Sequence, residues 1–443
     1  AHQGCGALWN LAENNVDNGV ALMAASAAEV LLSAMRFHSD NTDVVKLCCM
    51  VLCNLAENNV DNRVALMASD AVDVVFSAMT EHSDKADVAA CSCGALRTLT
   101  MNKADHQVAL IDAGAGEALV NVLQIHSADR LIAGLGFHIL FGLAVNADNR
   151  VVLMNADAGG AVVEAMRAHN TDAVISECGC AALGNLALNN ADNQDMLMAD
   201  GAGRAVLSAM RTHSTDSVVT GSGCAALWKL ASIADNKVAL MEAGAVELVL
   251  SAMQTHSASA ITAASGCAAL SNLADNNEHN QTVLVAAGAG EAVGSAMRTH
   301  RSDWVVVEYG CVALAKLSQS NQANKLALKE IGAVDAAREA MRTHPTHPRI
   351  QEWGDRVLEQ LEGSVDKLSS HFVATTPQAP NTPLSAATED AAACVICFET
   401  FDDDEHALTV FDCGHVACEM CAHKQRTCHA CRRRITRRTK VYM

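Results

Sequence analysis

Eight residues that can bind a metal ion follow one another at short intervals near the carboxyl end of the chain. Their order is Cys394-x2-Cys397-x15-Cys413-x-His415-x2-Cys418-x2-Cys421-x6-Cys428-x2-Cys431. Two residues between paired cysteines allow both thiolates to reach one tetrahedral Zn2+ at ~2.3 Å. Eight ligands make two sites of four, and closed sites that leave no position for a reactive water are structural. The spacing therefore predicts two Zn2+ ions that hold a fold.

The other interpretation of these cysteines is that they are scattered through a small apolar core. Seven of the 18 Cys lie within residues 394–431, beside a His at ligand spacing, and this density favours metal binding. The segment has few large apolar residues. Metal binding, worth ~10–16 kcal/mol in small zinc modules, is therefore expected to supply its stability.

The ligand order, with its single His in fourth place, resembles the RING finger of C3HC4 type; in the related PHD order the His stands fifth. The resemblance implies E3 ubiquitin ligase activity without a covalent nucleophile, because such a domain recruits a ubiquitin-charged E2 enzyme and promotes transfer to a substrate lysine. It also implies a cross-brace, with Cys394, Cys397, Cys418 and Cys421 on one zinc ion and Cys413, His415, Cys428 and Cys431 on the other.

The same resemblance assigns roles to three further residues. Ile396 stands where RING fingers place an apolar E2 contact, and Arg432 where many keep an arginine that hydrogen-bonds both E2 and ubiquitin. Tyr442 stands where C-terminal RING fingers carry an aromatic that reaches the partner's ubiquitin across a RING homodimer. The alternatives are packing inside the zinc fold for Ile396 and a solvated basic tail for Arg432.

Two positions depart from the family pattern. His429 replaces the usual proline after the seventh ligand, and Gln425 replaces an apolar residue of the RING helix. Both fall where the E2 would dock, so they bear on the choice of E2 and on activity. A scaffold whose zinc module mediates assembly without ligase activity is therefore the alternative function.

The residues upstream form a repeat with a period of 43 to 44 residues, seen in a Leu-x-x-Leu pair and in a histidine column. The leucine pairs begin at Leu8, Leu52, Leu96, Leu140, Leu183, Leu227, Leu270, Leu314 and Leu358. The histidines are His38, His82, His126, His169, His213, His256, His300 and His344. Three-residue spacing places both leucines of a pair on one helix face.

Each unit is predicted to contain three helices: a short one after an Asn/Asp-rich loop, a second after a Gly break, and a third that carries the leucines. Composition agrees, because half the residues are apolar, only 3% are aromatic and five are proline. In period, helices and Asn-Leu-Ala element the unit resembles the armadillo repeat, with the HEAT repeat as near alternative. This predicts an all-α superhelical solenoid whose third helices line a groove for a protein substrate.

Armadillo proteins that bind peptides use an Asn of the third helix. The resemblance therefore indicates Asn10, Asn54, Asn185 and Asn272 as groove residues, with local loop hydrogen bonding as the alternative. The tryptophan that nuclear-import receptors place four residues earlier is absent, which disfavours nuclear transport. The histidines are interpreted as helix C-terminal residues favoured by the macrodipole. The cysteine column (Cys5, Cys93, Cys180, Cys224, Cys267 and Cys311) is interpreted as small core residues.

The distribution of charge and the spacing of the cysteines limit the partners and the location that we expect for the protein. Residues 1–390 hold 43 acidic and 23 basic residues, which argues against nucleic-acid binding. Many of the eleven cysteines outside the zinc module lie in adjacent or alternate pairs, such as Cys48-Cys49 and Cys178-x-Cys180, that cannot easily bridge. Together with the absence of a secretory segment, this predicts the cytoplasm or nucleus. No apolar run is long enough for a membrane span.

The predicted organisation is therefore about eight armadillo-like units in residues 1–363, a flexible disordered linker in 364–391, and the RING finger with its basic tail in 392–443. The first unit is truncated, because Ala1 falls inside a repeat, and we expect upstream residues to be missing. The linker holds Pro377, Pro380 and Pro383 among small polar residues, a composition that does not fold. The sequence names neither the substrate, nor the E2, nor the ubiquitin linkage.

Overall fold

The computed structural model describes residues 1–57, 59–100, 104–319 and 322–363, and the backbone of three short strands further on. It divides into two compact units, Ala1–Asp366 and Lys367–Met443. The first unit contains every described helix, α1 to α25. None of these helices is by itself long and apolar enough to cross a membrane.

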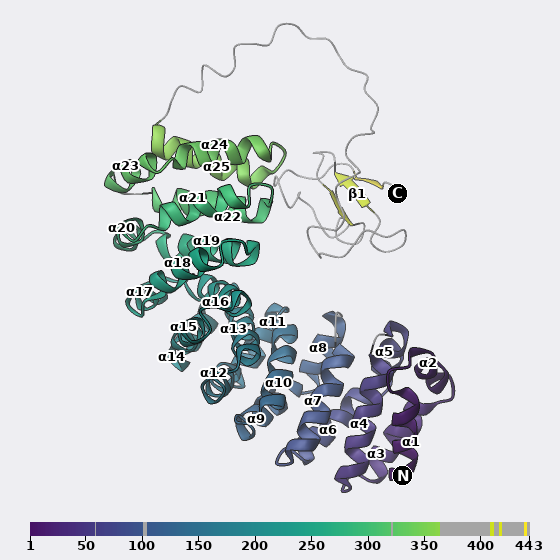
Figure 1. Ribbon diagram of the computed structural model, residues 1–443. Coiled ribbons are helices and arrows are strands. Elements are labelled where there is room, and N and C mark those ends of the chain that lie inside the picture. The colour runs from purple at the N-terminus through teal and green to yellow at the C-terminus, as the bar shows by residue number, and fades with distance from the viewer. Residues whose placement is uncertain are drawn as a thin grey trace. The chain divides into compact units, whose positions relative to one another are not determined.

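The helices form eight sets of three, preceded by a single helix that corresponds to a third helix (Figure 1). The first helices are α2 Val16–Ala24, α5 Val60–Met67, α8 Ala104–Asp112, α11 Ala147–Asn155, α14 Ala191–Asp200, α17 Ala234–Glu242, α20 Glu278–Ala286 and α23 Gln322–Glu330. The second helices are α3 Ala27–Phe37, α6 Ala71–Glu81, α9 Ala115–Ile125, α12 Ala158–Ala168, α15 Ala202–Thr212, α18 Ala245–Thr255, α21 Ala289–Thr299 and α24 Ala333–Thr343.

The third helices form a continuous row in which each packs against the next (Figure 1). They are α1 His2–Ala12, α4 Thr42–Ala56, α7 Ala86–Thr100, α10 Arg130–Leu143, α13 Ala173–Ala187, α16 Ser217–Leu230, α19 Ala260–Ala274, α22 Trp304–Leu317 and α25 Pro348–Glu362. This is the predicted three-helix unit, and the fold of the repeat region is an all-helical, armadillo-like solenoid.

The turns use the residues that the sequence pattern indicated. Asn and Asp side chains accept backbone N–H groups at the starts of first and third helices, as Asn190 does from Asn193 and Asp216 from Val218 and Val219. Between first and second helices, Gly244 has a φ of 86° and Gly288 one of 90°. Only glycine adopts this left-handed conformation without cost, so it ends one helix and starts the next at a sharp angle.

The core lies between successive helices and repeats along the row. The leucine pairs of the inner units are buried, as are all six residues of the cysteine column. Burial raises the pKa of Cys224 and Cys267 to about 12, so these thiols act as small apolar side chains. A Cβ on Gly223 would lie 2.4 Å from Cγ of Met210, and glycine here lets the second helix approach the third closely.

The histidine column joins neighbouring repeats. Each of the eight histidines caps the C-terminal end of a second helix, as predicted. In six of them Nε2 also donates to a backbone carbonyl oxygen of the preceding repeat at 2.7 to 3.1 Å. The pairs are His82 with Ser39, His126 with Ser83, His213 with Asn170, His256 with Ser214, His300 with Ser257 and His344 with Arg301. Inter-repeat hydrogen bonding therefore explains this column more fully than the macrodipole alone.

The second unit contains three described strands, β1 Leu408–Phe411, β2 Val416–Cys418 and β3 Arg438–Lys440. They form an antiparallel sheet in the order β2-β1-β3, with Thr409 opposite Ala417 on one side and Lys440 on the other. The predicted linker, 364–391, lies outside the described residues.

Candidate functional site

The candidate site of the solenoid is the row of third helices, where the four predicted groove asparagines lie. Asn185 on α13 donates through Nδ2 to the carbonyl oxygen of Phe141 at 3.1 Å, and Asn272 on α19 donates to Trp228 at 2.7 Å. Both bonds reach back to the preceding third helix. These two amide nitrogens therefore join adjacent repeats. Of the two amide oxygens, that of Asn185 accepts from Lys229, whereas that of Asn272 has no hydrogen-bond partner in the described structure.

The other two predicted groove residues differ from this pair. Asn10 on α1 is exposed. The Nδ2 of Asn54 on α4 is buried and has no hydrogen-bond partner among the described residues. A peptide role for the four asparagines stays a prediction.

A second asparagine column, not singled out from the sequence, closes the ends of the third helices. In six repeats an Asn at the third position of the next first helix donates to the carbonyl of the second leucine of the Leu-x-x-Leu pair. The donors are Asn18, Asn62, Asn149, Asn193, Asn236 and Asn280. The recurring Asp-Asn dipeptide in the loops was the signal that could have revealed this cap.

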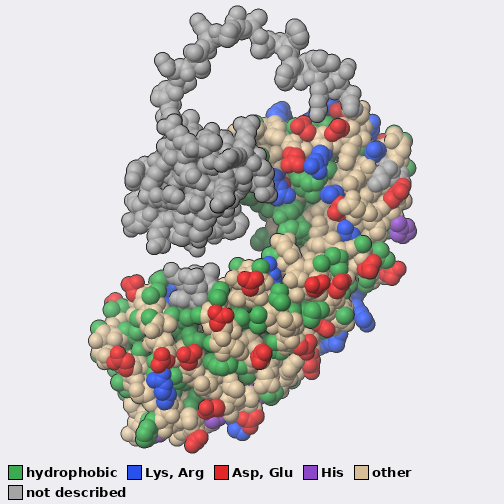
Figure 2. All heavy atoms as spheres, turned by 180° about the vertical axis from the view of Figure 1, so that it is seen from behind, with side chains coloured by type: hydrophobic (Ala, Val, Ile, Leu, Met, Phe, Trp, Pro, Cys, Tyr) green, Lys and Arg blue, Asp and Glu red, His purple; other side chains and the backbone are tan. Residues whose placement is uncertain are grey.

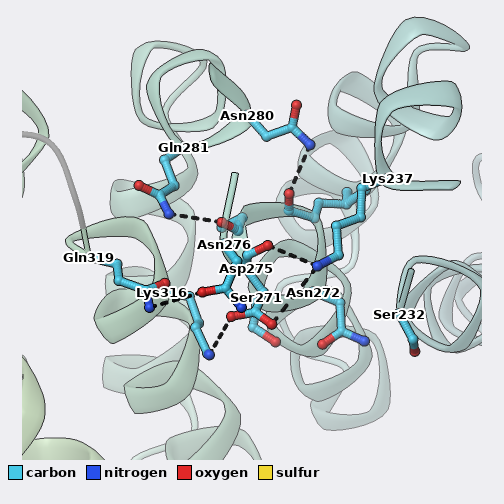
Figure 3. A network of polar contacts seen from close by, with 12 residues as sticks. Ser232, Lys237, Ser271, Asn272, Asp275, Asn276, Asn280, Gln281, Lys316 and Gln319 are labelled. Atoms are coloured by element: carbon cyan, nitrogen blue, oxygen red, sulfur yellow. Dashed lines mark hydrogen bonds and ion pairs between the residues drawn. The ribbon is translucent and has the colours of Figure 1, made fainter. Parts of the chain in front are cut away.

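Polar side chains from α17, from the C-terminal cap of α19 and from α22 converge, and we call Lys237, Asp275 and Lys316 the Asp275 cluster (Figure 3). Lys316 donates to Asp275 Oδ1, while Lys237 Nζ lies 2.8 Å from the backbone oxygen of Asp275 and 3.9 Å from its Oδ2. The Lys237 side chain is only 7% exposed. Its pKa is lowered, chiefly by burial, with Asp275 opposing that effect.

Aromatic residues gather beside this cluster in a chain that has four Trp and two Tyr. Trp228 on α16 meets Tyr309 on α22 edge to face, with 5.3 Å between ring centroids. Further along, Trp353 on α25 has Lys316 at 5.5 Å and Arg356 at 4.3 Å from its ring centroid. Partly exposed Trp, Tyr and Arg are the residues that most often anchor protein partners.

Acidic side chains are spread over the face of the solenoid seen in Figure 2, with basic ones among them. Most described ion pairs are exposed, and such pairs add little stability. The Glu308 carboxylate is an exception: it is buried on α22, lies 3.0 Å from Arg349, and has a pKa raised by burial and lowered in part by Arg349.

The predicted zinc ligands other than Cys418 lie outside the described residues, as do Ile396, Gln425, His429, Arg432 and Tyr442. For Cys418 the structure gives only the backbone, at the end of β2. In the chain, Cys413 and His415 fall between β1 and β2, which pair as a hairpin. Within the described part of the molecule, no three His, Cys, Asp or Glu side chains could hold a metal ion.

The comparisons place the repeat region among armadillo-like solenoids. The family described as LRRK2 ARM repeat matches residues 66–243. The crystal structure of one engineered protein superposes with a TM-score of 0.60 at 19% identity, covering 82% of this chain and 95% of that one. A second engineered protein superposes at 0.50 and 24% identity, covering 56% of this chain and 98% of that one. These structural likenesses concern the fold.

One curated relative has a named activity. The chain is 37% identical over 68 residues to an E3 ubiquitin-protein ligase, RGLG4, of Arabidopsis thaliana. The match spans 15% of this chain and 16% of the relative's length. Together with the armadillo repeats, this partial similarity supports a protein-binding scaffold.

Proposed function

We propose that the chain is a RING-type E3 ubiquitin ligase. Its C-terminal zinc module recruits an E2-ubiquitin conjugate, and its third-helix row selects a protein substrate. The observation that carries the proposal is the uninterrupted C3HC4 ligand order from Cys394 to Cys431. The partial similarity to a plant ubiquitin ligase supports it, as does the β1–β2 hairpin, which the chain connects through Cys413 and His415.

Two structural zinc ions would be held by the seven cysteines and the histidine of this order, because thiolate and imidazole are the ligands that Zn2+ prefers. With four protein ligands on each ion, the metal supplies stability only. The protein's contribution to the reaction is orientation. Ile396 and Arg432 hold the E2-ubiquitin thioester so that a substrate lysine attacks its carbonyl carbon, an isopeptide bond forms and the E2 thiol leaves.

The test is autoubiquitination by the full chain with a panel of E2 enzymes, together with a zinc assay. Active protein should contain two zinc ions. Ile396→Ala should lose most activity and keep both ions, whereas Cys413→Ser should lose zinc and activity together. Zinc-loaded protein that is inactive with every E2 would contradict the ligase assignment.

A scaffold without ligase activity is the second candidate, and it is favoured by His429 and Gln425, which depart from the usual E2-docking residues. A titration of labelled E2 against the full chain separates the two functions. Saturable binding that Ile396→Ala weakens supports the ligase, and absence of binding supports the scaffold.

We further propose a RING homodimer and a cytoplasmic or nuclear location. Sedimentation of the chain tests the homodimer, and microscopy of the tagged chain tests the location.

A further inference from the structure

The Asp275 cluster has a counterpart 87 residues earlier in the chain, at the same positions of the repeat. Arg150 corresponds to Lys237, and Lys229 corresponds to Lys316. Arg150 and Lys237 are both the fourth residue of a first helix, α11 and α17. The residue that corresponds to Asp275 is Leu188. The upstream set therefore keeps both cations and has no carboxylate between them.

The residues at the position of the carboxylate have the same backbone conformation in the two sets. Leu188 ends α13 with φ −62° and ψ 119°, and Asp275 ends α19 with φ −62° and ψ 121°. In both repeats the preceding Asn, Asn185 or Asn272, donates to the carbonyl of the previous third helix. A carboxylate at position 188 would therefore stand where Asp275 stands in its own repeat.

The two upstream cations are left without a carboxylate. Arg150 is 6% exposed, donates to the carbonyl oxygens of Ala144 and Val145 at 2.9 and 3.1 Å, and has a buried Nε without a hydrogen-bond partner in the described structure. Lys229 Nζ donates to Asn185 Oδ1 at 2.8 Å. Neither makes an ion pair with any described carboxylate, and Asp148, near Arg150, is not within ion-pair distance.

The pKa shifts of the two cations agree with the absence of a carboxylate beside them. Burial lowers the pKa of Lys229, and the Arg150 charge lowers it further. Burial also lowers the pKa of Arg150. Carbonyl and amide dipoles at a helix C-terminus satisfy part of the hydrogen bonding of such cations, but they carry no full negative charge. Two cations whose charges repel each other, with no carboxylate beside them, are stabilised when an anion from elsewhere joins them.

We propose that Arg150 and Lys229 form a receptor for a carboxylate side chain of a bound protein, so that the substrate segment held on the third-helix row carries Asp or Glu at this point. The proposal rests on the substrate-binding role proposed above. It names an acidic peptide segment as the occupant, because the internal counterpart of the missing group is itself an aspartate, Asp275. Charge-assisted hydrogen bonds from two cations favour such a carboxylate strongly over the corresponding amide.

A carboxylate introduced at position 188 tests whether the two cations face this position. In the full chain, Leu188→Asp should melt about 2 °C or more above the matched, uncharged Leu188→Asn, because only the aspartate is paired by Arg150 and Lys229. In a Lys229→Met background this difference should shrink. Equal melting temperatures, or a lower one for the aspartate, would show that the two cations do not face position 188 and would overturn the proposal.

The partner side is tested with two pools of twelve-residue peptides randomised over neutral residues, one with a central Glu and one with a central Gln, captured on immobilised full chain. Wild-type protein should retain the Glu pool at least about tenfold better, as one charge-assisted contact allows. Leu188→Asp should abolish that preference, since its own carboxylate fills the site. Equal retention by the wild type, or an unchanged preference in Leu188→Asp, overturns the carboxylate receptor.

These outcomes separate the receptor from the function on which it rests. Retention of neither pool would contradict peptide binding by the solenoid, and the receptor with it. Equal retention of both pools leaves the substrate-binding role intact and removes only the receptor. Autoubiquitination by Leu188→Asp should equal that of the wild type, because the substitution lies in the solenoid and leaves the zinc module unchanged.

Discussion

Two segments of the solenoid, residues 127–229 and 214–316, have the same order of helices and different polar contacts. In the later segment Lys237 and Lys316 meet Asp275, and His256 donates to the carbonyl of Ser214. In the earlier one the corresponding residues are Arg150, Lys229 and Leu188, and the Nε2 of His169 is buried without a partner in the described structure. The apolar residues that stack the helices recur in both segments, so the fold tolerates unsatisfied polar groups in one of them.

This difference indicates that one set of residues fixes the spacing of the helices and another set makes the polar contacts that vary between repeats. Buried leucines, cysteines and the close Gly–Met contacts set the spacing of the helices and recur with the period. Polar residues on the third-helix row can change from repeat to repeat, because their cost is local and small compared with the shared core. A polar group left unpaired in one repeat and paired in another is therefore a position at which to test for contact with a partner.

The largest expected effect comes from removing the carboxylate of the later segment. Asp275→Leu should lower the free energy of unfolding by about 2 kcal/mol, because it leaves Lys237 buried and unpaired. Complete burial would cost more, but the side chains of Asp275 and Lys316 are 27% and 21% exposed. Chemical denaturation of the full chain measures the change, and Asp275→Asn, which keeps an acceptor oxygen, is the control. A Leu variant as stable as the wild type would show that the cluster contributes nothing.

A smaller effect is expected from the histidines that join repeats. His256→Phe should cost about 1 kcal/mol, since it leaves the carbonyl of Ser214 without its donor. His169→Phe, the matched substitution in the earlier segment, should cost less or stabilise, because this Nε2 has no described partner to lose. Thermal melting of the two variants gives the comparison, and equal losses would mean that the ladder of histidine bonds has no energetic role.

The smallest effect concerns the pH dependence that Lys229 adds. Its pKa in the folded protein is lowered by burial and by Arg150, so between that pKa and the ordinary Lys value of about 10.4 the unfolded chain binds more protons. Stability should therefore gain a contribution as the pH rises through this window. Lys229→Met should remove the gain and be the more stable protein at neutral pH. Denaturation at several pH values tests this, and parallel profiles of the two proteins would contradict it.

Much of the solenoid could be predicted from sequence. Period, helix number, caps at Asn and Asp, glycine breaks and the buried cysteine column all follow from local rules that depend on spacing along the chain. The contacts of the candidate site were harder to predict from the sequence. Asn185 and Asn272 were expected to face a ligand, whereas their amide nitrogens bind the preceding repeat, and the cation pair of Arg150 and Lys229 was not foreseen. Contacts between side chains 40 or more residues apart depend on the stacking angle of the repeats, which sequence spacing does not specify.

The amino-acid order alone determined that three-helix units of 43 to 44 residues stack, because each amphipathic unit buries its leucines only against a neighbour. It also determined that eight zinc-type ligands stand in C3HC4 order, because metal-ligand spacing is a property of the chain. Only the tertiary structure decided which polar side chains meet. Lys237, Lys316 and Asp275 come from three helices, and their attraction depends on distances that stacking alone establishes. For the same reason only the folded repeats could show that Leu188 has the backbone conformation of Asp275.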